Sequence, residues 1–320
     1  MSRAILAPLV PLYAASVGVK NLAYEHGWLK PKRLEWPVIS VGNLSVGGAG
    51  KTPVVIRLAQ LLTEQGRSID VLSRGYGRST QQTVRVDADG SADQFGDEPI
   101  LIARNARVPV YVGASRYEAG LLAEREQLKP SLHLLDDGFQ HRQLTRDIDI
   151  VVLHRSDFDE RLLPAGQLRE PLSALTRASV IVLRAEDQHL EDQLRRRGIE
   201  APVWIQRRRL VVETSVRAIA FCGIARPEEF FAALRASGSD IPASSHYRDH
   251  HVYTDSDLKH LIQLRNSHQA ASFITTEKDW MRLTPKQRTR LAPLNVARLD
   301  VVFENETAVA GQLLSLLVRK

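Results

Sequence analysis

The chain has 320 residues, of which 43% are hydrophobic and 25% charged, a balance typical of globular proteins and not of fibrous or wholly disordered ones. Its one cysteine, Cys222, excludes an intramolecular disulfide and a zinc cluster built on several thiolates, which suits a reducing compartment. The formal net charge of +6 favours anionic partners, but no zinc-finger spacing or aromatic-interleaved RNA-binding motif accompanies it. We therefore expect no nucleic-acid partner, and the sequence indicates no obligate protein partner.

The N-terminal segment, residues 1–34, contains an uncharged run over 4–19. This run is shorter than a membrane-spanning helix and is interrupted by two prolines. A signal peptide, a helix packed on its own domain and a segment lying in the membrane interface all fit the pattern. We favour the interfacial segment, anchored by basic and aromatic residues at headgroup depth: Arg3, Lys20, Lys30, Lys32, Arg33, Tyr13, Tyr24 and Trp28.

Short β-rich runs alternate with helical patterns between residues 35 and 213. Residues 36–43 predict a buried strand, after which apolar residues recur at helical spacing until Gly66 ends the helix. Further strands are predicted within 68–75, 108–113, 131–138, 147–155 and 178–187, with helices around 115–127 and 188–197. This alternation predicts an α/β fold with a mostly parallel sheet flanked by helices, which would bind its ligand at the carboxyl ends of the strands.

A second unit of sequence follows an extended connection over 201–216. It contains a strand over 217–223, a helix over 227–236, a strand over 271–276 and a last strand–helix pair. We therefore expect a nucleotide-binding domain over 35–213, with 1–34 attached to it, and a smaller C-terminal α/β domain over 214–320.

The stretch "NLSVGGAGKTPVV", residues 43–55, lies between a predicted strand and a predicted helix, as a phosphate-binding loop requires. Ser45 stands where the general pattern has its first glycine, although the later glycines can supply the same backbone freedom. A plain strand–helix glycine turn is the alternative. The loop predicts that ATP phosphates meet inward-pointing backbone N–H groups, that the lysine reaches the outer phosphates and that the threonine ligates Mg²⁺. These residues are Gly47, Gly48, Ala49, Gly50, Lys51 and Thr52.

Two pairs of carboxylates stand out next. Asp136 and Asp137 end an apolar run, so one could serve Mg²⁺ while the other meets a partner, although Asp137–Gly138 could also be a simple turn. Asp97 and Glu98 lie in a probable loop, and a kinase needs a carboxylate near the acceptor hydroxyl. On composition alone they are ordinary loop acids.

Basic residues mark two further loops. Arg74 and Arg78 lie on a glycine-rich loop after a strand, where guanidinium groups could grip phosphate. His250 and His251 could bind a metal, but no third ligand has a typical spacing, so a histidine that orients a catalytic carboxylate is the more economical interpretation. A surface histidine is the alternative.

The ordered set of these motifs resembles the tetraacyldisaccharide 4'-kinase family of lipid A biosynthesis. The resemblance runs over nearly the whole chain and rests on "VGNLSVGGAGKTP", "LSRGYGR", "GDEP", "LDDGFQH", "FCGIARPEEFF", "RDHHVYT" and "TTEKDW". It implies transfer of the γ-phosphate of ATP, with Mg²⁺, to the 4'-hydroxyl of a tetraacylated disaccharide 1-phosphate, forming lipid IVA. It also implies action at the cytoplasmic face of the bacterial inner membrane.

The same resemblance implies roles for individual residues. Asp97 would be the base and His250 its partner from the second domain, so that assembly of the pair depends on closure. Lys51 and Thr52 keep their roles in the phosphate loop. The remaining roles are metal binding by Glu98 and Asp136, substrate or phosphate contacts by Arg74, Arg78 and Arg116, and support of the site by Asp137 and His141.

Three rival functions fit parts of the pattern. A membrane-associated ATPase that partitions DNA or positions division shares a "GGxGKT" loop, but it depends on a lysine where this chain has Val46. A soluble small-molecule kinase would pack the N-terminal run on its own fold. A non-catalytic nucleotide-binding module would bind ATP without transferring phosphate.

Overall fold

The computed structural model describes residues 3–48, 50–129, 131–212 and 216–318, and Ala49 of the predicted phosphate loop lies outside those ranges. Within them, twelve strands form a single sheet. From one edge to the other, the strands are β10 (Ala243–His246), β9 (Ala218–Cys222), β11 (Ser272–Thr276), β12 (Leu294–Phe303), β8 (Val203–Val211), β7 (Val180–Arg184), β6 (Ile148–Val152), β1 (Val38–Gly42), β5 (Leu132–Asp136), β2 (Ile69–Ser73), β4 (Val110–Val112) and β3 (Val84–Arg85).

Most neighbouring strands in this sheet are parallel. The exceptions are the antiparallel pairs β12–β8 and β4–β3. Strands β1, β2, β6 and β7 are buried along their whole length, which is why each reads as a continuous apolar run and not as an alternating one. The mostly parallel sheet predicted from the sequence is confirmed, as one mixed sheet.

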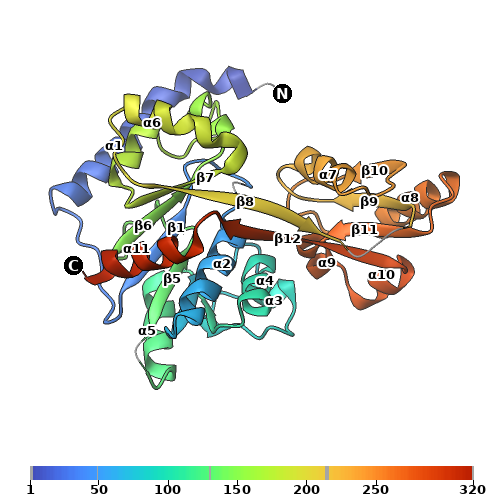
Figure 1. Cartoon of the computed structure of the whole chain (residues 1–320), viewed down its shortest axis with the longest axis horizontal. Helices are drawn as coiled ribbons and strands as arrows, with labels where there is room; N and C mark the ends of the chain where they lie inside the picture. Colours follow the sequence, from blue (N-terminus) through green and yellow to red (C-terminus); the bar gives the residue numbers. More distant parts are fainter. Residues whose placement is uncertain (1–2, 49, 130, 213–215, 319–320) are drawn as a thin grey trace.

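Helices flank the sheet on both faces (Figure 1). The predicted helices after the phosphate loop, around 115–127 and over 227–236, are confirmed as α2, α5 and α7. The α-helices are α1 (Val10–Glu25), α2 (Lys51–Glu64), α3 (Ala92–Phe95), α4 (Asp97–Ala106), α5 (Arg116–Glu126), α6 (Glu191–Arg196), α7 (Pro227–Ala236), α8 (Asp255–Ser267), α9 (Glu277–Arg282), α10 (Pro285–Arg290) and α11 (Glu306–Val318). The 3₁₀ helices are η1 (Arg3–Leu9), η2 (Arg155–Phe158), η3 (Leu172–Arg177) and η4 (Ala185–Leu190).

Two long strands connect the two parts of the molecule (Figure 1). The segment expected to be an extended connection is strand β8, which pairs with β12 along Gln206–Val211. The first residues of β12 pair with β11 and its last residues pair with β8, so one strand belongs to both parts. Helix α11 then packs its Val309 and Leu313 into the same hydrophobic cluster as α2. The division of the chain at 213/214 into two domains remains a prediction.

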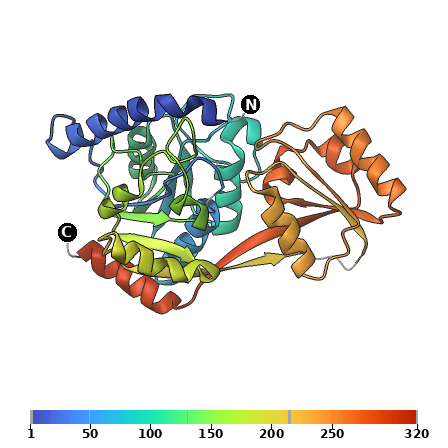
Figure 2. The same cartoon turned by 90° about the horizontal axis from the view of Figure 1, so that it is seen from above.

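The N-terminal helix extends beyond the uncharged run. Ile5–Glu25 forms 21 residues of helix with a mean hydropathy of 1.4, long and apolar enough by composition to cross a membrane, and none of α1 is buried. The helix lies along one outer side of the larger part, while α11 lies on the opposite side (Figure 2). The Tyr13 hydroxyl donates to the Arg169 carbonyl at 3.0 Å, and the Tyr24 ring lies 5.2 Å from the Arg142 guanidinium carbon. These two aromatic residues therefore contact the protein body, and their position at headgroup depth remains a prediction.

Candidate active site

The phosphate loop connects the end of β1 to the start of α2. Gly47 and Gly50 have φ angles of 101° and 84°, a left-handed backbone that a residue without Cβ adopts at little cost. The Asn43 amide nitrogen donates to the Ser45 carbonyl at 2.8 Å, and Ser45 is buried. Ser45 is therefore part of the turn that enters the loop, and the glycine freedom comes two residues later.

Lys51 is held at the mouth of this loop by two oxygen acceptors. Its Nζ donates to Asn43 Oδ1 at 2.9 Å and lies 3.3 Å from Asp137 Oδ1. Asp137 also accepts from Arg169 Nη1 at 2.9 Å. Burial disfavours the ionised Asp137, but the charges of Lys51 and Arg169 outweigh it and lower the pKa of this carboxyl. Asp137 thus acts as the resting counter-ion of the phosphate-loop lysine.

Asp136, the last residue of β5, offers an oxygen without a protein partner. Its Oδ2 accepts from Ser73 Oγ at 3.1 Å, whereas its buried Oδ1 has no hydrogen-bond partner among the described residues. Burial, together with the charges of Glu98 and Asp137, raises the pKa of Asp136 to about 7. A buried carboxylate that is short of positive charge suits a hard cation, and Thr52 and Glu98 line the same cavity. The oxygen donors therefore fit Mg²⁺.

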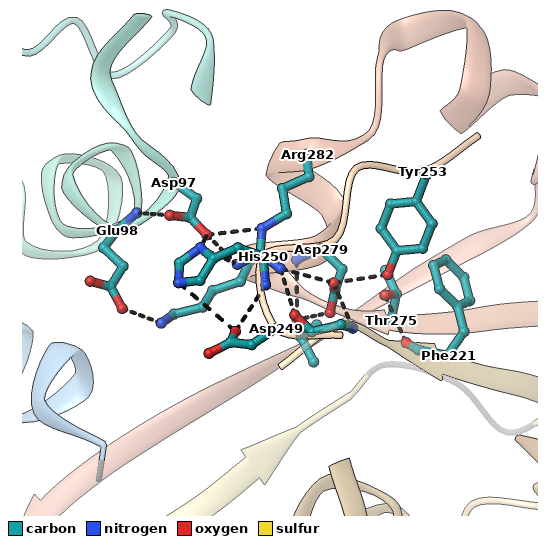
Figure 3. Close-up of polar contacts among 12 residues, drawn as sticks. Asp97, Glu98, Phe221, Asp249, His250, Tyr253, Thr275, Asp279 and Arg282 are labelled. Carbon is teal, nitrogen blue, oxygen red and sulfur yellow. Dashed lines mark hydrogen bonds and ion pairs between the residues drawn. The ribbon is translucent and has the colours of Figure 1, made fainter. Parts of the chain in front are cut away.

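A second group of charges joins α4 to the opposite part of the molecule (Figure 3). Asp97 Oδ2 lies 3.4 Å from His250 Nδ1 and accepts from Arg282 Nε at 2.9 Å. Glu98 forms an ion pair with Lys278. These residues of α4 thus contact residues more than 150 positions later in the chain. The pairing of β8 with β12 places the second part of the molecule beside α4.

The electrostatics of this group keep Asp97 ionised. Burial disfavours its charged form, but the His250 hydrogen bond and the charges of Arg282 and Lys278 hold its pKa well below the usual range. The hydrogen bond to Asp97 in turn raises the pKa of His250 against the opposing effect of burial. His250 also has a φ of 58°, a strained conformation of the kind that functional sites retain. The two side chains therefore form an ion pair whose protonation states support each other.

One cavity of about 1010 Å³ connects the phosphate loop to this charged group. Arg74 and Arg116 line it, and Arg116 Nε is buried without a hydrogen-bond partner among the described residues. Three predicted site residues within the described ranges do not line it: Arg78, His141 and Asp97. Arg78 Nη1 donates to the Gln82 carbonyl at 2.9 Å, and the backbone N–H of His141 donates to the Gly138 carbonyl. Asp97 is buried and contacts His250, which does line the cavity. Burial, with nearby arginines, lowers the pKa of His141 to about 4.

The structure thus brings most of the predicted site residues to one cavity. Its lining includes Gly47, Gly48, Gly50, Lys51, Thr52, Arg74, Glu98, Arg116, Asp136, Asp137 and His250. Sequence reasoning missed Arg282, Lys278 and Arg169 as partners of the acidic residues. Lys278 lies within the "TTEKDW" motif and Arg282 lies two residues beyond it, but nothing local indicates which carboxylates they meet.

Comparisons with known proteins extend over the whole chain. The LpxK family, tetraacyldisaccharide-1-P 4'-kinase, matches residues 2–318. The chain is 42% identical over 325 residues to a tetraacyldisaccharide 4'-kinase of Koribacter versatilis, which covers 98% of this chain and 99% of the relative. A relative of the same name from Geobacter metallireducens is 40% identical over 303 residues, covering 88% of this chain and 89% of the relative.

A solved structure gives the same answer. The crystal structure of LpxK from Aquifex aeolicus in complex with ATP matches with a TM-score of 0.78 and 33% identity over 99% of both chains. The fold and the full-length relatives agree with the resemblance read from the motifs. The chain therefore belongs to the tetraacyldisaccharide-1-P 4'-kinase family and is a phosphotransferase of lipid A biosynthesis.

Proposed function

We propose that the protein transfers the γ-phosphate of ATP to the 4'-hydroxyl of tetraacyldisaccharide 1-phosphate, forming lipid IVA, and that Asp97 receives the hydroxyl proton. The observation that carries this assignment is the 3.4 Å approach of Asp97 Oδ2 to His250 Nδ1 beside the cavity that also holds the phosphate loop. A bond forms from the 4'-oxygen to the γ-phosphorus, the bond to ADP breaks and the proton passes to the carboxylate.

The phosphate loop would hold the nucleotide. The backbone N–H groups of Gly47, Gly48 and Gly50 are the donors we assign to the phosphates, together with Ala49, which lies outside the described residues. Lys51 now rests on Asn43 and Asp137 at 2.9 and 3.3 Å. Bound phosphates would offer Lys51 several anionic oxygens in place of the neutral Asn43 amide oxygen, and hydrogen bonds to ionised acceptors are the stronger ones.

Asp97 suits late proton transfer. The transition state of phosphoryl transfer is loose, so the hydroxyl is held in line before its proton leaves and a strong base is not required. A carboxylate with a lowered pKa is ionised before the transfer, so it is available to accept the proton once the hydroxyl is held in line. His250 would orient Asp97 and stabilise its charge. The two lie in different parts of the fold, so the pair depends on how those parts meet, and the structure holds them 3.4 Å apart.

Mg²⁺, when bound, would neutralise charge that develops on the phosphates. We assign it to Thr52, Glu98 and Asp136, and the unpartnered Asp136 Oδ1 supports this assignment. Asp137 supports the site by pairing with Lys51.

Arg74 and Arg116 would contact the phosphate groups of the lipid, because both line the cavity on the side of β2 and α5. Arg78 and His141 lie outside the lining, so we keep them as residues that support this region. The nearby charges that lower the pKa of His141 include Arg116 and Arg74, which indicates a strongly positive environment.

The N-terminal helix would dock the enzyme at the cytoplasmic face of the bacterial inner membrane. Apolar side chains on this helix stay exposed, with 73% exposure for Ile5 and 71% for Leu12. Burying such side chains in the interface is favourable by about 25 cal/mol per Å². Wild-type protein should therefore pellet with anionic liposomes, whereas Leu12→Glu should stay in solution and Val302→Glu, on β12, should pellet. Equal pelleting of Leu12→Glu and wild type would remove the docking assignment.

The catalytic assignment is tested with radiolabelled ATP and tetraacyldisaccharide 1-phosphate, with a doubly phosphorylated lipid as the readout. Asp97→Ala and His250→Ala should each lower the rate by about 10²–10⁴-fold, the usual contribution of a positioned acid or base. Asp93→Ala and His246→Ala, which change exposed residues of the same types, should leave the rate unchanged. Transfer near the wild-type rate in both dyad variants would remove the assignment, and ADP release without a labelled lipid would favour an ATPase.

A further inference from the structure

A guanidinium group from β8 rests directly on the phosphate loop. A Cβ built on Gly50 would fall 2.7 Å from Arg208 Cζ, so the Arg208 head group occupies the space above this glycine. Arg208 and Gly50 both line the large cavity.

Of the three consecutive arginines in β8, only Arg208 lies on the face of the strand that meets the phosphate loop. Side chains alternate across a β-strand, so Arg207 and Arg209 point away from the face that Arg208 uses. Arg207 is accordingly exposed and pairs with Glu304 at 2.7 Å. The side chain of Arg208 is only 15% exposed. The run "RRR" therefore contains one half-buried arginine beside the loop and two exposed neighbours that serve as natural controls.

Positive charge exceeds negative charge around Arg208. Its Nη1 lies 3.8 Å from Glu229 Oε2, an oxygen that already accepts from Arg184 Nη2 at 2.8 Å. Arg226 approaches the other oxygen of Glu229 at 3.3 Å, and Arg184 Nε is buried without a hydrogen-bond partner among the described residues. Burial and the charge of Arg184 lower the pKa of Arg208 to about 10, against the effects of Glu229 and Glu186. Glu229 thus contacts three arginines that face the cavity, and Glu186, 3.8 Å from Arg184, is another carboxylate in the lining beside them.

We propose that Arg208 binds a phosphate group of ATP from above the loop, and that Glu229 holds this guanidinium in place while no phosphate is present. The inference rests on the proposed nucleotide site. A polyphosphate presents several anionic oxygens to a planar guanidinium fork, whereas Glu229 shares one oxygen at a long distance. Because Glu229 lies on α7 and Arg208 on β8, exchange of the carboxylate for phosphate also changes a contact between the two parts of the fold.

Calorimetric titration of the full-length protein with ATP and with adenosine tests the proposal. Arg208→Ala should weaken ATP binding by about 10-fold or more, the value of a hydrogen bond to a charged group, and should leave adenosine affinity within about twofold. Arg207→Ala should leave both affinities unchanged. An unchanged ATP affinity in Arg208→Ala would overturn the proposal. An equal loss for adenosine would also overturn it, because Arg208 would then shape the cavity and not bind phosphate.

Two further variants separate this inference from the nucleotide site itself. If Lys51→Ala leaves ATP affinity unchanged, the phosphate-loop assignment fails; if Lys51→Ala weakens binding and Arg208→Ala does not, only the Arg208 assignment fails. Glu229→Gln should raise ATP affinity severalfold by removing a carboxylate that competes with phosphate for Arg208, and this gain should vanish in the Arg208→Ala background. A gain that persists without Arg208 would contradict the role of Glu229 as its resting partner.

Discussion

The pair Asp97–Arg282 allows a direct energetic test of how the two parts of the fold meet. Asp97 on α4 and Arg282 on α9 are 5% and 8% exposed as side chains, and Nε lies 2.9 Å from Oδ2. At an effective dielectric constant of about 20, two unit charges at this distance attract by about 6 kcal/mol, and desolvation of both groups offsets much of that. The net value of the pair is therefore small.

Removing one partner is a different matter, because a buried charge is left behind. Such a loss costs about 3–5 kcal/mol, and we expect the lower end for Arg282→Met because His250 and Lys278 still face Asp97. Asp97→Asn should cost a similar amount, since it leaves Arg282 with Asp279 at 3.4 Å and the Gly223 carbonyl at 2.6 Å. The double variant should cost less than the sum by about 2 kcal/mol.

Urea unfolding at pH 7, followed by circular dichroism and by tryptophan fluorescence, measures this coupling in a double-mutant cycle. Coincident transitions from the two probes show that a single free energy of unfolding applies. Lys259→Met, on the exposed side of α8, is the matched control for the removal of a surface cation. Additive effects to within about 0.5 kcal/mol would refute a buried ion pair between α4 and α9 in solution.

Three further predictions concern the core and the return of the chain. Gly42→Ala should cost about 2–3 kcal/mol in unfolding experiments, because its Cβ would lie 2.5 Å from Phe139 Cβ and 2.7 Å from its backbone nitrogen; an unchanged melting temperature would contradict this packing. His133 is buried between two carboxylates, and its hydrogen bonds to them outweigh the effect of burial and raise its pKa. Its contribution to the free energy of unfolding is therefore complete below about pH 6.5 and is lost as the pH rises through the raised pKa. His133→Gln should remove this part of the pH dependence of urea unfolding, and identical pH profiles for the variant and wild type would refute the prediction. Arg57→Ala breaks a 2.7 Å contact to Glu306 at the start of α11 and should cost about 1 kcal/mol, with faster proteolysis of the C-terminal helix as the specific readout; equal cleavage rates would count against it.

Sequence alone located the elements whose signals are local. The strand before the phosphate loop, the loop and the helix after it occupy consecutive residues, so apolar periodicity and glycine placement describe them without reference to the rest of the chain. The same holds for α7, predicted over 227–236 and observed as Pro227–Ala236. Strand β8 was not predicted as a strand. The stretch "APVWIQRRRLVVETSV" looks like an extended connection because its charged residues break the apolar pattern, and only its antiparallel pairing with β12 makes it part of the sheet.

Residue partners were decided by the tertiary structure. Asp97 reads as an ordinary loop acid, yet in the fold it begins α4 and faces His250 and Arg282 from the distant part of the sequence. Tyr13 and Tyr24 suit a membrane interface by type, but the docking of α1 turns them toward Arg169 and Arg142. Such contacts depend on how whole elements pack, and side-chain type carries no information about that.

The sequence by itself determined the family, the parallel α/β core and the phosphate loop, because motifs and apolar patterns within short runs of consecutive residues identify each of them. Only the tertiary structure decided that one strand, β12, belongs to both parts of the sheet and that α11 returns to pack beside α2. It also decided which cations face the carboxylates of the cavity. The physical reason is that ion pairing and burial act between atoms a few ångströms apart, whereas the residues that supply those atoms lie more than a hundred positions apart in the chain.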